Sequence, residues 1–252
     1  MTLAHQALRK PAGAVRGLAV DIGSSRTRVW APGAGVLADV PSGPVTRGRV
    51  TDAVPHQRLL REVADAAFGE DRAGTVVMLC HPVLAGPEER AAARRMVAEL
   101  GPAGVVSVHS ARAAAAYAGP AGGGPLLVVD LGAALTEVTL LVDGRVQDAR
   151  LAEIGLDDLP DGDGSTAPMV HAAAGMVRDL WRRDRTGAVL GALRRGVLVA
   201  GGGALRMDLT ARLALRLGAR LRLANDPATS TVRGAGLLLS STLRHPGAAR
   251  RD

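Results

Sequence analysis

The sequence contains very little cysteine and few aromatic residues, and each shortage excludes a class of protein. Cys80 is the only cysteine among 252 residues, which excludes an internal disulfide and a cysteine-based zinc site. Aromatic side chains make up 2% of the sequence, too few to build a platform on which nucleic-acid bases stack. We therefore expect a protein of a reducing compartment, without a structural metal and without a nucleic-acid partner.

Long apolar runs are also missing. The longest uncharged stretch, residues 113–129, is interrupted by glycine and proline, and residues 1–17 lack the apolar block of a secretory signal. We therefore expect a cytoplasmic protein. The net charge of +7 comes from arginine, since Lys10 is the only lysine. Ordinary solvated charge is the first interpretation, and attraction to an anionic membrane surface or an acidic partner stays open.

What the sequence does contain is one twelve-residue pattern in two copies. The stretches "LAVDIGSSRTRV" (18–29) and "LVVDLGAALTEV" (127–138) share Leu, Val, Asp, Gly, Thr and Val at matching places. An Asp that ends a strand, followed by Gly and small residues, predicts a tight turn with outward-pointing backbone N–H groups. Such a turn can face a phosphate while the Asp meets Mg²⁺, directly or through water. Two of them would hold a polyphosphate, and the glycine turn of "VLVAGGGALR" (197–206) could lie against a nucleoside.

Strand-like and helix-like segments alternate along the chain, which predicts a layered α/β fold with two related lobes. We expect a flexible tail at 1–16, lobe I at 17–120, lobe II at 121–243 and a basic tail at 244–252. Apolar patterning predicts strands at 17–23, 27–32, 75–82, 104–110, 126–132, 136–146, 149–155, 195–204 and 220–224. It predicts helices at 55–69, 87–100, 111–119, 168–184, 205–219 and 230–243.

These motifs resemble those of the actin-like ATPase superfamily, and within it most closely those of MreB, the bacterial rod-shape proteins. "DIGSSRTRVW" is similar to the first phosphate motif and "VVDLGAALTEV" to the second. Residues 196–239 are similar to the adenosine motif and the closing helices, and residues 44–52 to the segment that leads back into lobe I. The resemblance covers nearly all of residues 17–243.

The resemblance implies an actin-like, ribonuclease H-like two-lobed fold that binds ATP and Mg²⁺. It assigns phosphate contacts to eight residues: Asp21, Gly23, Ser24, Ser25, Thr27, Asp130, Gly132 and Thr136. It assigns Mg²⁺ to Asp21 and Asp130, through water if not directly. It assigns adenosine contacts to Gly201, Gly202, Gly203 and Ala204.

The chain departs from the family in three ways. It has no room for most of either small subdomain, and its second phosphate turn reads Gly132-Ala133-Ala134-Leu135 where the family has three glycines and a threonine. His109 and Ser110 occupy the region of the family's catalytic Glu, and we assign no catalytic residue there.

These departures predict a reduced MreB-like accessory of the cytoskeleton and of cell shape, with weak or absent ATP binding and hydrolysis. Its expected partners are actin-like filaments, cell-wall morphogenesis proteins or an anionic membrane. The alternatives are a small-molecule kinase of the same superfold and an adaptor that works without nucleotide.

Overall fold

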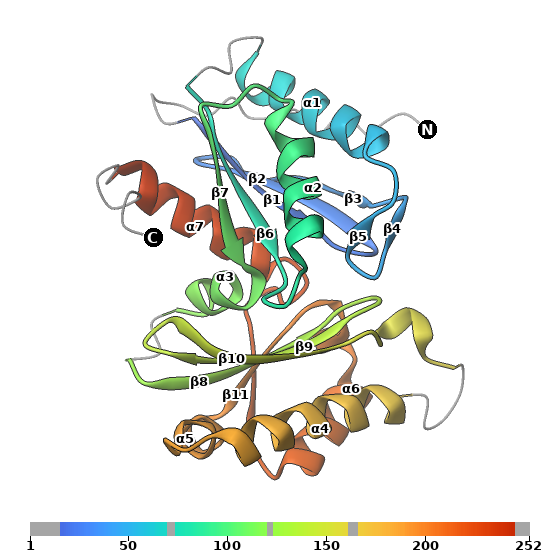
Figure 1. The fold of residues 1–252 in the computed structure, drawn as a ribbon, viewed down its shortest axis with the longest axis vertical. Coiled ribbons are helices and arrows are strands. Elements are labelled where there is room, and N and C mark those ends of the chain that lie inside the picture. The colour runs from blue at the N-terminus through green and yellow to red at the C-terminus, as the bar shows by residue number, and fades with distance from the viewer. Residues whose placement is uncertain (1–15, 70–73, 120–122, 161–165, 245–252) are drawn as a thin grey trace.

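The computed structural model describes residues 16–69, 74–119, 123–160 and 166–244, which form two lobes stacked along the long axis of the molecule (Figure 1). Each lobe is built on a five-stranded sheet. The first sheet has the order β3-β2-β1-β6-β7, from β1 (Gly17–Ile22), β2 (Arg26–Ala31), β3 (Gly35–Pro41), β6 (Val76–His81) and β7 (Gly104–His109). The second has the order β10-β9-β8-β11-β12, from β8 (Pro125–Leu131), β9 (Thr136–Val142), β10 (Arg145–Ala152), β11 (Val197–Ala200) and β12 (Leu221–Leu223).

The two sheets have the same topology, which accounts for the repeated sequence pattern. In each, three antiparallel strands are followed by two strands parallel to the first of them. The turns between the first two strands also match. Gly23 N donates to Arg26 O at 3.0 Å, and Gly132 N donates to Leu135 O at 2.9 Å. One structural unit therefore occurs twice in the chain.

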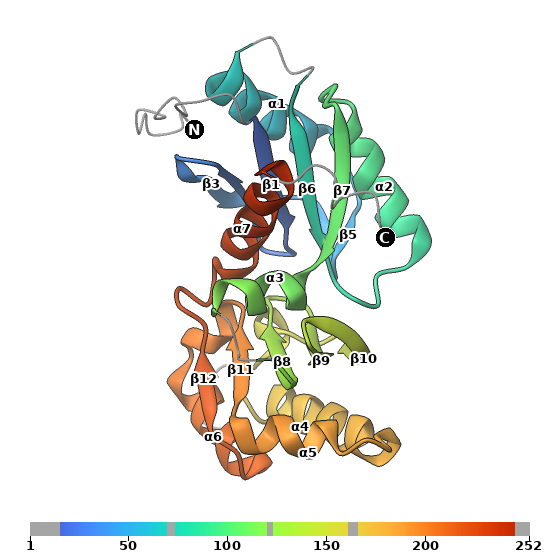
Figure 2. The same cartoon turned by 90° about the vertical axis from the view of Figure 1, so that its left-hand side faces the viewer.

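Helices cover the outer face of each sheet. In the first lobe, α1 (Val54–Phe68) and α2 (Pro87–Ala98) bury Leu60 and Val97 against the sheet. In the second lobe, α4 (Ala167–Arg183), α5 (Ala188–Arg195) and α6 (Met207–Leu217) share one apolar core with the sheet. The short helix α3 (Ser110–Tyr117) lies between the lobes, as Figures 1 and 2 show. None of the helices in the described residues is both long and apolar enough to cross a membrane.

The last helix, α7 (Ser230–Arg244), returns to the first lobe although it follows the second lobe in sequence (Figure 2). It packs against β1, β2 and β6 and makes extensive contact with α3. Two glycines allow this approach, because a Cβ on Gly234 would collide with the Ala113 carbonyl and one on Gly236 with the Trp30 ring. Helix α7, within the 121–243 range expected for lobe II, therefore covers lobe I.

Only short segments stand where the resemblance would place the two small subdomains, whose near absence the sequence predicted. Between β3 and α1 there is one hairpin, β4 (Val45–Thr46) with β5 (Arg49–Val50). Between β10 and α4, the described residues hold a single 3₁₀ turn, η1 (Leu156–Asp158). The predicted tails at 1–16 and 244–252 and the boundary near 120 lie almost entirely outside the described residues.

Several elements differ from the prediction. Strands β3, β4 and β5 and helix α5 were not predicted, and the strand predicted at 136–146 is interrupted by a turn. Asp143 and Gly144 have φ of 51° and 74°, the geometry of a two-residue hairpin turn, for which Asp-Gly is a strong signal.

Candidate nucleotide-binding site

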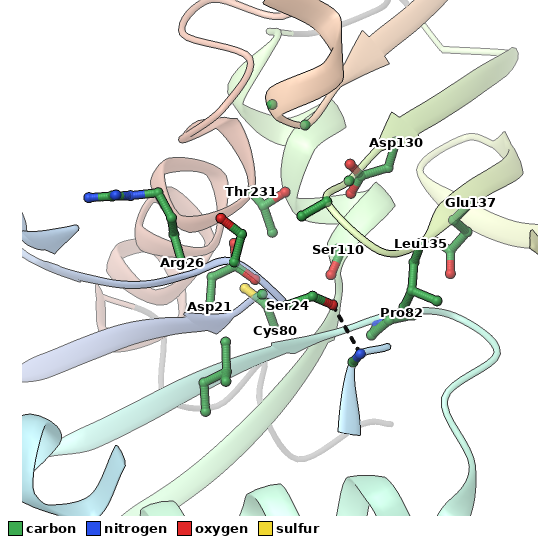
Figure 3. A pocket seen from close by; sticks show the side chains of 18 of the residues that line it. Asp21, Ser24, Arg26, Cys80, Pro82, Ser110, Asp130, Leu135, Glu137 and Thr231 are labelled. Atoms are coloured by element: carbon green, nitrogen blue, oxygen red, sulfur yellow. Dashed lines mark hydrogen bonds between the residues drawn. The ribbon is translucent and has the colours of Figure 1, made fainter. Parts of the chain in front are cut away.

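A cavity of about 190 Å³ lies between the two lobes. Its walls come from the turn 23–26, the turn 132–135, the end of β6, the start of α3 and the start of α7. A further glycine turn at 201–202 follows β11 and completes the wall on the side of the second lobe. Figure 3 shows Asp21 and Ser24 on one side of this cavity, with Asp130, Glu137 and Leu135 on the other. The repeated turns therefore face each other across it.

In the second turn the carbonyl groups are bonded to other parts of the protein. Those of Gly132 and Ala133 accept hydrogen bonds from the amides of Leu156 and Asp157, at 3.1 and 2.8 Å. The carbonyl of Ala134 accepts one from Arg47 Nη1 at 3.1 Å. By contrast, the amides of residues 133–135 donate to no acceptor within the described part of the chain. Consecutive unbonded amides can form an anion-binding concavity, and the alanines at 133 and 134 leave these amides unbonded.

The first turn is built in a similar way. Ser42 Oγ donates to the Gly23 carbonyl at 2.6 Å, and Ser42 N donates to the Ser25 carbonyl at 2.9 Å. The amides of Ser24 and Ser25 have no acceptor among the described residues. Thr27 is fully buried, and its Oγ1 lies 2.9 Å from Ser42 Oγ. Thr27 therefore supports the turn from beneath through Ser42.

Two carboxylates at equivalent places face the cavity. Asp21 ends β1 and Asp130 ends β8, and burial raises the pKa of each to about 6. Arg28, directly opposite Asp21 in the β1–β2 ladder, opposes this rise in both groups, because its positive charge favours the carboxylates. Neither carboxylate accepts a hydrogen bond within the described residues.

This pair fits the requirement of a hydrated Mg²⁺ ion. Mg²⁺ keeps several waters and is commonly held by one or two carboxylates together with phosphates of the substrate. The described residues contain no group of three or more His, Cys, Asp or Glu that could hold a metal without such help. Asp21 and Asp130 therefore suit a metal that arrives with a phosphate chain.

A third acid in the cavity, Glu137, joins the lobes. It lies on β9 directly opposite Asp130 and is 5% exposed. Its Oε2 accepts a hydrogen bond from Val83 N of the first lobe at 2.8 Å, and its Oε1 accepts one from Thr139 Oγ1 at 3.1 Å. Burial and the neighbouring Asp130 charge raise the pKa of Glu137 to about 7.

The structure brings most of the residues predicted from the sequence to the cavity. The ones that line it are Asp21, Gly23, Ser24, Ser25, Ser110, Asp130, Gly132, Gly201 and Gly202. Thr27, Thr136, Gly203 and Ala204 do not; all four are buried. Thr136 donates its hydroxyl to the Ile154 carbonyl at 2.8 Å, which ties β9 to the end of β10.

His109 does not line the cavity either. Its ring packs edge-on against His81, with 4.9 Å between the ring centroids, at the ends of the neighbouring strands β7 and β6. Burial lowers the pKa of both histidines, so both rings are neutral near pH 7. Ser110, the next residue, is the one that faces the cavity.

Several cavity residues were not assigned to the site from the sequence, among them Arg28, Gly48 and Glu137. Strand pairing carries a signal for two of them. Arg28 pairs with Asp21 and Glu137 pairs with Asp130, and directly paired residues share one face of a sheet. Gly48 carried no comparable signal, because only the folded hairpin brings it to the turn.

Comparisons with known proteins show which fold this is. No known sequence family and no curated protein matches the chain. Among solved structures, MreB5 of Spiroplasma citri bound to ADP matches with a TM-score of 0.81 and 15% identity, over 93% of this chain and 99% of that one. The same protein bound to AMPPNP gives a TM-score of 0.83 and 15% identity, over 94% and 99%.

A more distant structural match is the ethanolamine utilization protein EutJ of Carboxydothermus hydrogenoformans. It has a TM-score of 0.61 and 17% identity, over 90% of this chain and 91% of that one. Identities this low establish a shared fold and not a shared activity. The chain therefore has the two-lobed actin-like fold, in an MreB-like form.

Proposed function

We propose that this chain binds an adenine nucleotide with Mg²⁺ between its lobes and acts as a reduced MreB-like component of an actin-like filament system. The observation that carries the proposal is the pair of equivalent turns, each with unbonded amides, that face each other beside Asp21 and Asp130. Amides of this kind bind phosphate oxygens, and the two carboxylates suit Mg²⁺. The MreB5 structures that hold ADP and AMPPNP support the proposal, because they share this fold.

Each part of the site has a separate task in this proposal. The amides of 24–25 and 133–135 hold the phosphates, and Asp21 and Asp130 hold the water shell of Mg²⁺. Arg28 keeps both carboxyls charged at neutral pH. The nucleoside lies against Gly201 and Gly202, where bare backbone permits close approach.

Hydrolysis is expected to be weak or absent. An attacking water needs a positioned polar group, and the second turn presents the apolar Leu135 instead. Both oxygens of Glu137 already accept hydrogen bonds, and His109 packs against His81 outside the cavity. The bound nucleotide would then stabilise one arrangement of the two lobes, and no cycle of hydrolysis and conformational change would follow.

The proposed partner is an actin-like filament of the cell-shape machinery. Filaments need heterologous contacts that do not close, and this chain lacks much of the usual small-subdomain surface. We therefore expect it to join or cap another filament more readily than to polymerise alone. Sedimentation alone and beside a full-length MreB filament tests this, and a protein that stays in the supernatant in both cases would contradict it.

Charge in the second lobe favours an acidic surface as a further contact. Residues 166–223 contain 11 arginines and 3 aspartates, so this segment alone carries a net charge of +8. Trp181 is 57% exposed on α4 among these arginines. Peripheral binding to an anionic membrane fits this combination. Sedimentation with anionic and with neutral vesicles tests it, and equal binding to both would contradict it.

The decisive experiment for the nucleotide site is calorimetric titration with ADP and Mg²⁺, with Asp21→Ala as the control. Binding that is present in the wild type and lost in Asp21→Ala would support the proposal. Absence of binding at millimolar nucleotide would overturn it and leave an adaptor that works without nucleotide. Phosphoryl transfer to a small molecule that depends on Asp21 would favour the kinase alternative.

A further inference from the structure

The hairpin 45–50, formed by β4 and β5, crosses from the first lobe to the second beside the cavity; we call it the cross-cleft hairpin. At its tip, Gly48 N donates to Ser24 Oγ of the first turn at 3.1 Å, the bond drawn in Figure 3. The adjacent Arg47 donates from Nη1 to the Ala134 carbonyl of the second turn at 3.1 Å. One hairpin tip therefore contacts both phosphate turns.

The side chain of Leu135, the last residue of the second turn, packs against this hairpin tip. A Cβ built on Gly48 would lie 3.0 Å from Leu135 Cδ1, so the leucine side chain packs directly against the hairpin backbone. Leu135 also lines the cavity, and Figure 3 shows it beside Pro82 and next to Ser24. Leu135 and Pro82 therefore form an apolar part of the cavity wall at this end.

The positive charge of the hairpin is already neutralised. Arg47 Nη2 donates to Asp158 Oδ1 at 2.7 Å, and Arg47 Nη1 donates to the Glu153 carbonyl. Arg49 pairs with Glu89 and with Glu153, at 3.0 Å each. The titratable side chains that line the cavity include His81, which is neutral near pH 7, the acidic Glu137, and the cations Arg26 and Arg28 on β2. An additional phosphate at this end would find no uncommitted cation in the hairpin.

We propose that the cavity accepts a nucleoside diphosphate and excludes a third phosphate, and that Leu135 sets this limit. The inference rests on the proposed nucleotide binding and specifies its ligand. Two turns supply two sets of unbonded amides, which suits two phosphate groups. A third phosphate would have to move Leu135 off Gly48 and break the Arg47 contacts.

The test compares ADP with the non-hydrolysable analogue AMPPNP, each with Mg²⁺, by calorimetric titration of the full chain. We expect the wild type to bind ADP at least roughly tenfold more tightly, a ratio that titration resolves easily. In Leu135→Ala the apolar side chain no longer reaches the hairpin. We expect AMPPNP then to bind within about threefold of ADP.

Leu156→Ala is the matched control, because Leu156 also lines the cavity but lies near Gly202, at the nucleoside end. It should affect both ligands alike and leave their ratio as in the wild type. Arg47→Met is a second route to the same result if Leu135→Ala folds poorly. This substitution removes the hydrogen bond between the hairpin and the second turn, and it should also increase the affinity for AMPPNP relative to that for ADP.

Each outcome separates this inference from the proposed function. Equal affinities for ADP and AMPPNP in the wild type would overturn the diphosphate limit and leave nucleotide binding intact. A preference for ADP that neither Leu135→Ala nor Arg47→Met reduces would overturn the role of Leu135. Absence of binding by either nucleotide to every variant would overturn the proposed function itself, and the inference with it.

Discussion

Asp130 and Glu137 face each other directly across the β8–β9 ladder, so two acids share one wall of the cavity. In the first copy of the repeat the equivalent pair is Asp21 and Arg28, an acid and a base. The two lobes therefore present opposite charges at the same structural position. Of the three carboxyls in these two pairs, Glu137 in the second lobe has the highest pKa, about 7, against about 6 for Asp21 and Asp130.

Stability should depend on pH through Glu137. Its pKa rises from 4.5 in the unfolded chain to about 7 in the folded protein, so the folded state binds the proton more tightly. The resulting stabilisation is complete below about pH 4.5 and is lost as pH rises through 7, and a shift of this size corresponds to about 3 kcal/mol at most. The unfolding temperature of the nucleotide-free protein should therefore fall between pH 5 and pH 8.

Glu137→Gln tests the assignment, because it keeps the shape of the side chain and removes its charge. The unfolding temperature of the variant should fall less between pH 5 and pH 8, and the variant should be more stable than the wild type at pH 8. Asp21 and Asp130 add to the fall in the same direction, since their pKa values are also raised. Equal pH profiles for Glu137→Gln and the wild type would show that another group is responsible.

Binding of Mg²⁺ with nucleotide should release protons near pH 6. The pKa values of Asp21 and Asp130 are about 6, and a divalent cation favours the charged carboxylates. Affinity should rise as pH increases from 5 to about 7 and then level off. Titrations in buffers of different ionisation enthalpy measure the proton release directly. Nucleotide without Mg²⁺ is the control, and an equal proton release in its absence would argue against a metal at these residues.

Gly155 should tolerate no side chain. A Cβ on it would collide with the carbonyl of Ala133 and the amide of Ala134, which belong to the second turn. Because backbone atoms cannot rotate away, we expect Gly155→Ala to displace this turn, to cost about 1–3 kcal/mol in stability and to weaken nucleotide binding. Gly175→Ala on α4 is the matched control, since a Cβ there meets no atom within 4 Å. Equal unfolding temperatures for the two variants would contradict the prediction.

The cross-cleft hairpin should hold the lobes together through charge. Arg47 and Arg49 bridge to Asp158 and Glu153 of the second lobe, and these groups are partly exposed to solvent. Salt near 1 M shortens the screening length to about 3 Å and should loosen them. We expect a larger radius of gyration by small-angle scattering at high salt. The Arg47→Ala variant should have the larger radius of gyration already at low salt. A radius of gyration that changes neither with salt nor with this substitution would contradict the role of the cross-cleft hairpin in holding the lobes together.

Much of the fold follows from sequence alone. The repeat at Asp21 and Asp130 predicted two related lobes, because a strand, a tight glycine turn and a second strand form by local interactions. Alternation along strands also determines which residues can share a face. That rule places Arg28 and Glu137 beside the paired aspartates and turns Thr27 and Thr136 toward the other face, where both are buried. The sequence motif alone led to the prediction that Thr27 and Thr136 contact phosphate. The pairing register of the strands indicates instead that their neighbours Arg28 and Glu137 face the cavity.

The tertiary structure decided what no local pattern contains. Gly48 and Leu135 are 87 positions apart and meet only because the cross-cleft hairpin reaches the second lobe. Helix α7 follows the second lobe in sequence but covers the first, because Gly234 and Gly236 let it pack tightly on Ala113 and Trp30. His109 is at the end of the expected strand, yet its ring turns to His81 on the neighbouring strand. Contacts between distant segments depend on how the lobes pack, and packing is a property of the whole chain.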